Sequence, residues 1–186
     1  MNDSPGAAQM TGSRRVRDVA QRIAWELQEQ VIPASDRSAL RRIRPGEVGG
    51  PAFWKIAVRH LETSGMLVGS DETRRQRQER QWSTILAAMA AGPPSGRRTL
   101  GRALADVQVT EARVLRLLRA HEEALLDTVR AVVHQLSAAG CSFDWGDLAE
   151  LVCSDGATYA EVVRRRVAYD YYRQERSRQT TKEDRE

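Results

Sequence analysis

The chain has 186 residues, of which 41% are hydrophobic and 29% are charged, a balance typical of a globular protein that can bury a core. No apolar run approaches the ~20 residues of a membrane span, and residues 1–10 lack the basic-then-apolar order of a signal peptide. Cys141 and Cys153 have neither metal-ligand spacing nor the context of a nucleophile, so we expect a reduced, cytoplasmic protein with no membrane partner.

Basic residues are concentrated in the first half of the chain and are almost all arginine. The net charge is +4; residues 1–99 hold 16 basic and 10 acidic residues, whereas residues 100–186 hold 13 and 15. Only Lys55 and Lys182 are lysines, which leaves 27 arginines among the 29 basic residues. A GC-rich genome explains such a bias as well as function does. The functional explanation is that the planar guanidinium group matches phosphate and stacks on bases.

Helical periodicity predicts four helices in the first half, after a disordered segment at residues 1–12. We expect one helix after Ser13 that Pro33 ends, a short one capped by Ser35, one from Pro51 to Gly65, and one that begins at Asp71 and carries apolar residues as far as Met89. In these helices Trp54, Val58 and Trp82 are expected to face inward, whereas Trp25 is expected to face a partner.

The short second helix carries four arginines: Arg37, Arg41, Arg42 and Arg44. Like charges this close repel each other unless an anion or an acidic partner neutralises them. A solvated helix end explains this segment alone equally well. The arginines between Arg74 and Arg80 present the same choice, and there we favour a solvent-exposed extension.

Residues 93–98 are the predicted linker. The segment from Gly92 to Arg98 contains two prolines and two glycines, which stop any helix, and it should leave Arg97 and Arg98 mobile and exposed. The expected fold is therefore all-α, with two small helical bundles over residues 13–92 and 99–174. A polar, disordered tail is expected over residues 175–186.

Two helical segments meet between Leu100 and Ala120. Thr110 is placed to cap the second segment, in which Val114, Leu115, Leu117 and Leu118 supply an apolar face. Arg113, Arg116 and Arg119 recur every three residues, which keeps them in one broad sector away from much of that face. Arg102 could extend the same positive surface, although a solvated surface helix is the competing interpretation.

The remaining chain predicts three more helices. The longest runs from Glu122 to about Ala139 with Arg130 on its exposed face, the next is capped by Asp144, and Asp155 or Thr158 opens the last, with Val162, Val163, Val167 and Tyr171 inward. Five acidic residues and no basic one lie between Gly140 and Val163. We expect this acidic face to avoid nucleic acid and to meet a basic neighbour, such as a second copy of the chain.

The sequence offers no catalytic constellation. There is no G-x-S-x-G, no P-loop, no H-E-x-x-H and no cysteine–histidine metal spacing. His121 and His134 lack a carboxylate or cysteine at ligand spacing and are interpreted as structural. We therefore expect a protein that is not an enzyme and that uses no metal or cofactor.

Six short segments together resemble the CasB family, the small subunit of the type I-E CRISPR surveillance complex Cascade. They follow the order of the family and cover roughly Asp36 to Tyr172. The segments are S-A-L-R-R-I-R (Ser38 to Arg44), P-A-F-W (Pro51 to Trp54), L-G-R-A-L-A (Leu100 to Ala105), T-E-A-R-V-L-R-L-L-R-A (Thr110 to Ala120), F-D-W-G-D-L (Phe143 to Leu148) and A-Y-D-Y-Y (Ala168 to Tyr172).

The resemblance implies a non-catalytic subunit that binds nucleic acid without sequence preference and stabilises the R-loop. Its partners would be the other Cascade subunits with their crRNA, the unwound target DNA and a second copy of itself. The residues that would line its basic track are Arg41, Arg42, Arg98, Arg102, Arg113, Arg116, Arg119 and Arg130. Two alternatives stay open from the residues alone: a helix-turn-helix regulator built on residues 100–118, and a structural adaptor whose arginines meet acidic proteins.

Overall fold

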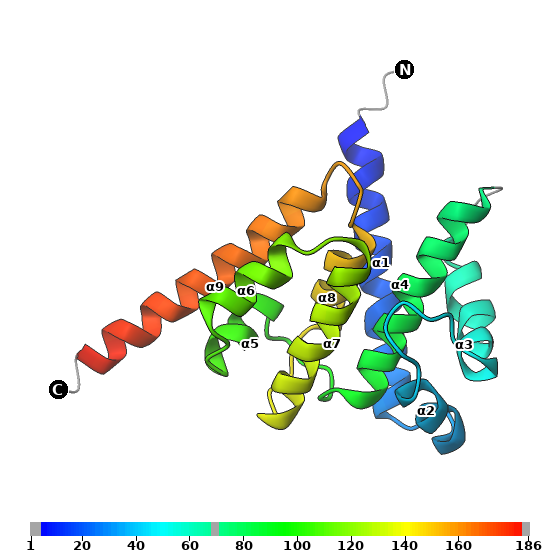
Figure 1. Ribbon diagram of the computed structural model, residues 1–186, viewed down its shortest axis with the longest axis horizontal. Helices are drawn as coiled ribbons and strands as arrows, with labels where there is room; N and C mark the ends of the chain where they lie inside the picture. The colour runs from blue at the N-terminus through cyan, green and yellow to red at the C-terminus, as the bar shows by residue number, and fades with distance from the viewer. Residues whose placement is uncertain (1–4, 68–70, 184–186) are drawn as a thin grey trace.

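The computed structural model describes residues 5–67 and 71–183, and within these ranges all regular structure is helical (Figure 1). The predicted all-α class is confirmed; in the same ranges the only β pairing is an isolated bridge between Ser95 and Phe143. The elements are α1 (Pro5–Gln28), α2 (Ala34–Arg41), α3 (Pro51–Ile56), the π-helix η1 (Ala57–Glu62), α4 (Glu72–Ala91), α5 (Leu100–Asp106), α6 (Glu111–Arg119), α7 (Glu122–Ala138), α8 (Trp145–Cys153) and α9 (Ala160–Glu183).

Both ends of the chain are more helical than the sequence suggests. Helix α1 begins at Pro5 and α9 runs to Glu183, whereas disorder is the prediction for residues 1–12 and 175–186. Proline suits a first helical turn, and the polar tail is rich in residues that favour helix. The tail is also anchored, because Arg178 donates to the carbonyl oxygen of Ala105 in α5. Residues 1–4 and 184–186 lie outside the described ranges.

Several helix pairs cross the predicted linker, among them α1 with α8 and α4 with α7 and α8. Helix α1 lies along α8, α5 lies along α9, and α4 contacts α2, α7 and α8. Figure 1 shows α9 (orange to red) extending away from the rest of the molecule, with α5 and α6 beside it. The buried apolar residues form one continuous core. The division into domains over 13–92 and 99–174 stays a prediction, and the two halves share this core through α1.

Local signals in the sequence account for most helix boundaries. Asp71 and Asp144 cap α4 and α8, and each carboxylate accepts backbone N–H groups of the first turn. Thr110 occupies the N-cap position of α6, although its hydroxyl makes no capping bond. Gly140 follows α7 with φ of 62°, a conformation that glycine adopts without strain. The predicted buried stripe of α7 is confirmed, from Leu125 to Leu136.

Three side chains predicted to face inward are exposed instead. Trp54, Val58 and Val162 lie on the solvent side of α3, η1 and α9. A broad run of apolar residues does not show where the buried face of a helix ends. Trp25, expected to face a partner, is also exposed.

A buried carboxylate joins four helices. Asp147 of α8 is 2% exposed. It accepts from Arg17 of α1, from Arg166 of α9 at 3.3 Å and from the backbone N–H of Leu100 in α5 at 2.9 Å. Arg17 also reaches Asp144 at 2.6 Å.

Glu150 lies beside Asp147 and shares its partners. Burial alone would raise the pKa of the Glu150 carboxyl, but hydrogen bonds from Arg166, Ser13 and Arg17 outweigh that effect and hold its pKa below the usual range. The acidic segment after Gly140 is therefore largely turned inward and neutralised by arginines of the same chain. The prediction that it forms a face for a basic neighbour is wrong for Asp144, Asp147 and Glu150.

We expect Asp147→Asn to lower the free energy of unfolding by about 2 kcal/mol, because Arg17 and Arg166 each lose one of their carboxylate partners while Glu150 still contacts both. Urea denaturation measures the loss. Glu161→Gln is the matched control: it breaks the exposed Glu161–Arg165 pair and should cost less than about 1 kcal/mol. Equal losses in the two variants would contradict the central role of Asp147.

We also expect Gly101→Ala to destabilise the protein, by about 2 kcal/mol. A Cβ atom at Gly101 would lie 2.3 Å from the carbonyl oxygen of Val167 and 2.9 Å from the amide nitrogen of Tyr171, so α5 and α9 would have to separate. Gly12 in α1 has open space at the same position, and Gly12→Ala should stabilise the helix by up to about 1 kcal/mol. Thermal unfolding measures both variants: the melting temperature should fall for Gly101→Ala and rise for Gly12→Ala.

Candidate nucleic-acid interface

Two neighbouring grooves carry arginines from three helices. The first, of about 130 Å³, lies where α2, α4 and α7 meet and is lined by Arg41, Arg130 and His134, with apolar residues at its floor. The second, of about 680 Å³, lies between α6 and α7 and is lined by Arg113, Arg116 and again His134. Because one side chain borders both grooves, they form a continuous surface, which we call the basic track.

The folding of α6 and α7 explains why these arginines face outward. Val114, Leu117 and Leu118 bury one side of α6, which leaves its arginines on the other. On α7 the buried stripe occupies the opposite side from Arg130 and His134, which are four residues apart and so project in a similar direction.

The arginines of the basic track differ in how firmly they are held. Arg41 donates from Nε to the carbonyl oxygen of Ala90 at 2.6 Å, and Arg113 donates to the amide oxygen of Gln135 at 3.2 Å. The side chains of Arg116 and Arg130 are exposed and form no ion pair or hydrogen bond with any described residue. Their guanidinium groups are therefore available to an external anion.

The other predicted site residues lie outside the two grooves. Arg42, next to Arg41, is exposed and bonds only the hydroxyl of Ser38. Arg102 of α5 and Arg119 at the end of α6 are exposed and line neither groove. Arg98 pairs with Asp106 at 3.0 Å and contacts the Cys141 sulfur, so much of its charge is neutralised.

The linker that holds Arg97 and Arg98 is exposed but anchored. The amide of Gly96 donates to the carbonyl of Phe143, and the carbonyl of Arg98 accepts from the amide of Asp144 at 2.7 Å. These bonds tie residues 93–98 to the segment before α8. The expectation of a mobile linker is corrected accordingly.

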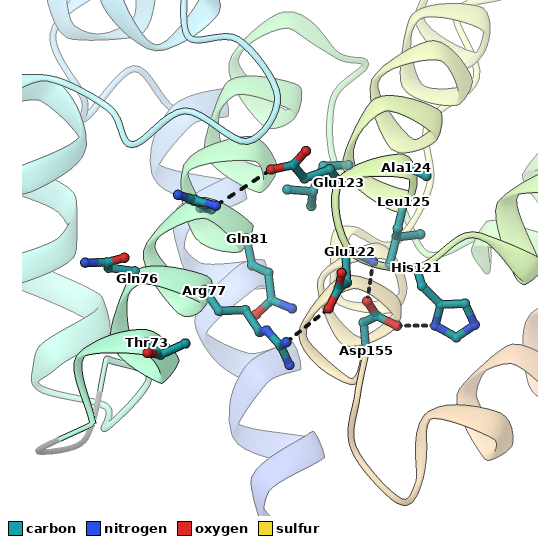
Figure 2. Close-up of a pocket in the computed structure, with 12 residues that line it drawn as sticks. Thr73, Gln76, Arg77, Gln81, His121, Glu122, Glu123, Ala124, Leu125 and Asp155 are labelled. Carbon is teal, nitrogen blue, oxygen red and sulfur yellow. Dashed lines mark hydrogen bonds and ion pairs between the residues drawn. The ribbon is translucent and has the colours of Figure 1, made fainter.

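Two further arginine runs are paired within the chain. Arg77 and Arg80 of α4 reach Glu122 and Glu123 of α7 across a pocket of about 420 Å³ (Figure 2). Arg164 is largely buried against Asp155, and Arg166 reaches the acidic residues of α8. These pairs link helices within the chain, so their arginines are less available to an external anion than Arg116 and Arg130 of the basic track.

Two groove residues were missed by sequence reasoning. His134 was interpreted as structural, yet it is exposed and lines both grooves. Its position one helical turn after Arg130 was the available signal. Asp127, on the wall of the second groove, gave no signal, because its position relative to α6 depends on tertiary packing.

Nothing in the described residues suggests a metal centre. No group of three or more histidine, cysteine or acidic side chains there is arranged to hold an ion. Among the described helices, none has the length and apolar character needed to cross a membrane.

Comparison with known proteins identifies the family. Residues 36–172 match the family described as CRISPR-associated protein Cse2. The fold is similar to the crystal structure of M. ruber CasB, with a TM-score of 0.67 and 20% identity over 88% of this chain and 97% of that one. It is also similar to a chain in the crystal structure of E. coli Cascade bound to a PAM-containing dsDNA target, with a TM-score of 0.61 and 21% identity over 85% and 97%.

These structural matches have low identity and show the shared fold. A comparison with curated proteins gives no match. The family match, in contrast, spans well over half of the chain and the same residues as the short segments that resemble CasB. The chain therefore belongs to the Cse2 family of CRISPR-associated proteins, the family of CasB.

Proposed function

We propose that this chain is the non-catalytic small subunit of a type I-E Cascade complex and that its basic track holds unwound target DNA by the phosphates. The observation that carries the proposal is the continuity of the two grooves. They bring Arg41, Arg130, Arg113 and Arg116 onto one surface although the four come from three separate helices. Membership of the Cse2 family supports the assembly with other Cascade subunits.

The geometry favours phosphate contact over reading of bases. Direct readout places donors from the first turn of one helix into a major groove. Helices α5 and α6 follow one another in the chain, but in the first turn of α6 Glu111 accepts from Tyr172 and Arg113 donates to Gln135 of α7, so these side chains are already engaged within the fold. Arginines spread over several helices instead suit a backbone of regularly spaced charges.

Sequence information would then come from another component. In RNA-guided complexes the guide pairs with the target strand, and protein contacts hold the strands by shape and charge. The small subunit would stabilise the R-loop beside the crRNA and a second copy of itself. Four principal arginines give weak binding alone, and assembly with the other subunits strengthens it.

We expect Arg116→Glu to weaken DNA binding by about ten-fold or more for every sequence tested, because a charged contact to phosphate becomes repulsive. Fluorescence anisotropy over a salt series measures the affinity, and the log–log slope should fall by about 0.7 on single strands. Arg22→Glu is the control, since Arg22 is an exposed arginine of α1 outside both grooves. Loss of sequence discrimination would indicate a regulator, and unchanged binding would indicate an adaptor for acidic proteins.

The second groove also contains one carboxylate, which predicts an effect of opposite sign. Asp127 lines the groove together with Arg113 and Arg116, where it repels an approaching phosphate. Asp127→Asn should therefore strengthen binding by about two- to five-fold at low salt. The gain should disappear as salt screens the charge. Weaker binding by this variant in the same anisotropy assay would place the DNA elsewhere.

A further inference from the structure

The outward side of α9 carries aromatic rings between arginines. This outer stripe consists of Val162, Arg165, Tyr169, Tyr172, Arg173 and Arg176, which recur at helical spacing. The Tyr169 side of the stripe is open: that residue is 66% exposed, and Val162 is 67% exposed. A row of large apolar side chains on a protein surface indicates a binding surface more often than it indicates a helix that only contacts solvent.

The orientation of the outer stripe is fixed by the opposite side of α9. Val163, Val167 and Tyr171 are buried there. The hydroxyl of Tyr171 donates to the carbonyl oxygen of Val109 at 2.8 Å, which prevents the helix from rotating about its axis. The close approach of α5 at Gly101 has the same effect. The rings of the outer stripe are therefore presented to solvent by a rigid helix.

The charge of the outer stripe is positive. Arg173 and Arg176 form no side-chain ion pair or hydrogen bond with any described residue, whereas Arg165 pairs with Glu161 at the edge of the stripe. The stripe itself contains no carboxylate. A second copy of the same stripe would be repelled by these like charges, while a polyanion with flat rings would be attracted.

The outer stripe is continuous with α6. The hydroxyl of Tyr172 donates to the Glu111 carboxylate of α6 at 2.6 Å, and α6 and α9 lie side by side in Figure 1. Arg113 and Arg116 of α6 line the second groove. A strand that leaves the groove along α6 would therefore pass next onto α9.

We propose that the outer stripe is a stacking surface for unpaired bases, with Tyr169 as its principal ring. This inference rests on the proposed function, since the basic track would deliver the strand. Every base has a π-face, so such stacking does not depend on sequence. Bases in a duplex are already stacked on each other. The outer stripe would thus make the subunit prefer a single strand over a duplex, which phosphate contacts alone do not do.

The test uses the full chain and three probes of equal length: an intact single strand, a single strand with abasic sites throughout, and a duplex. Anisotropy is measured at low salt for the wild type, Tyr169→Ala and Tyr169→Phe, with Trp25→Ala as the control for an exposed ring on α1. We expect Tyr169→Ala to bind the intact strand at least about five-fold more weakly and the abasic strand unchanged. Tyr169→Phe and Trp25→Ala should match the wild type.

The outcomes separate this inference from the proposed function. If the wild type binds intact and abasic strands equally, and Arg116→Glu weakens both, the basic track stands and base stacking is refuted. If the wild type binds no probe, both proposals fail. Equal weakening of Tyr169→Ala on intact and abasic strands would also refute stacking. Sedimentation tests whether the outer stripe contacts protein instead. If the wild type forms an oligomer and Tyr169→Ala dissociates it, the outer stripe is a contact between copies of the chain and stacking is refuted.

Discussion

The structure depends on a single buried carboxylate. Asp147 of α8 accepts bonds from Arg17 of α1, Arg166 of α9 and the first amide of α5, so four helices meet at one charged group. A lone carboxylate at this depth would be costly, and it is tolerated because Oδ1 accepts from two charged arginines and Oδ2 accepts from a backbone N–H. The same pairing removes negative charge from the surface. The same contacts neutralise Arg17 and Arg166, so the cluster takes charge of both signs out of the exposed surface.

The arginines of this protein fall into two groups that the sequence does not distinguish. One group, including Arg17, Arg164 and Arg166, is held by carboxylates of the same chain and serves the fold. The other, including Arg116 and Arg130, is exposed and unpaired within the described residues. Arg164 and Arg166 belong to a run that resembles a binding patch in composition, yet both are paired with carboxylates of the same chain. The density of arginine in the sequence therefore does not show which guanidinium groups are available to an external anion; the two grooves of the basic track and the partners of each side chain do.

Local rules predicted the helices well and the surfaces less well. The buried stripe of α7 and the caps at Asp71 and Asp144 follow from spacing and side-chain chemistry within a few residues. The ends of α1 and α9 are helical where polar composition predicts disorder, and the bond from Arg178 to Ala105 of α5 supports the end of α9. The acidic segment and the role of His134 required contacts between residues far apart in sequence. The family was recognisable because its segments keep their order along the chain.

The pairing of α1 with α8 has a consequence for folding during synthesis on the ribosome. Synthesis delivers α1 first, but Arg17 and Asp147 are separated by 130 residues. Until α8 emerges, the apolar side of α1 around Ile23 lacks a principal partner and its arginine lacks its carboxylate. Contacts this distant in sequence close late and slow the search for the native state. During synthesis, α1 therefore stays incompletely packed until α8 has been made, which is after most of the chain.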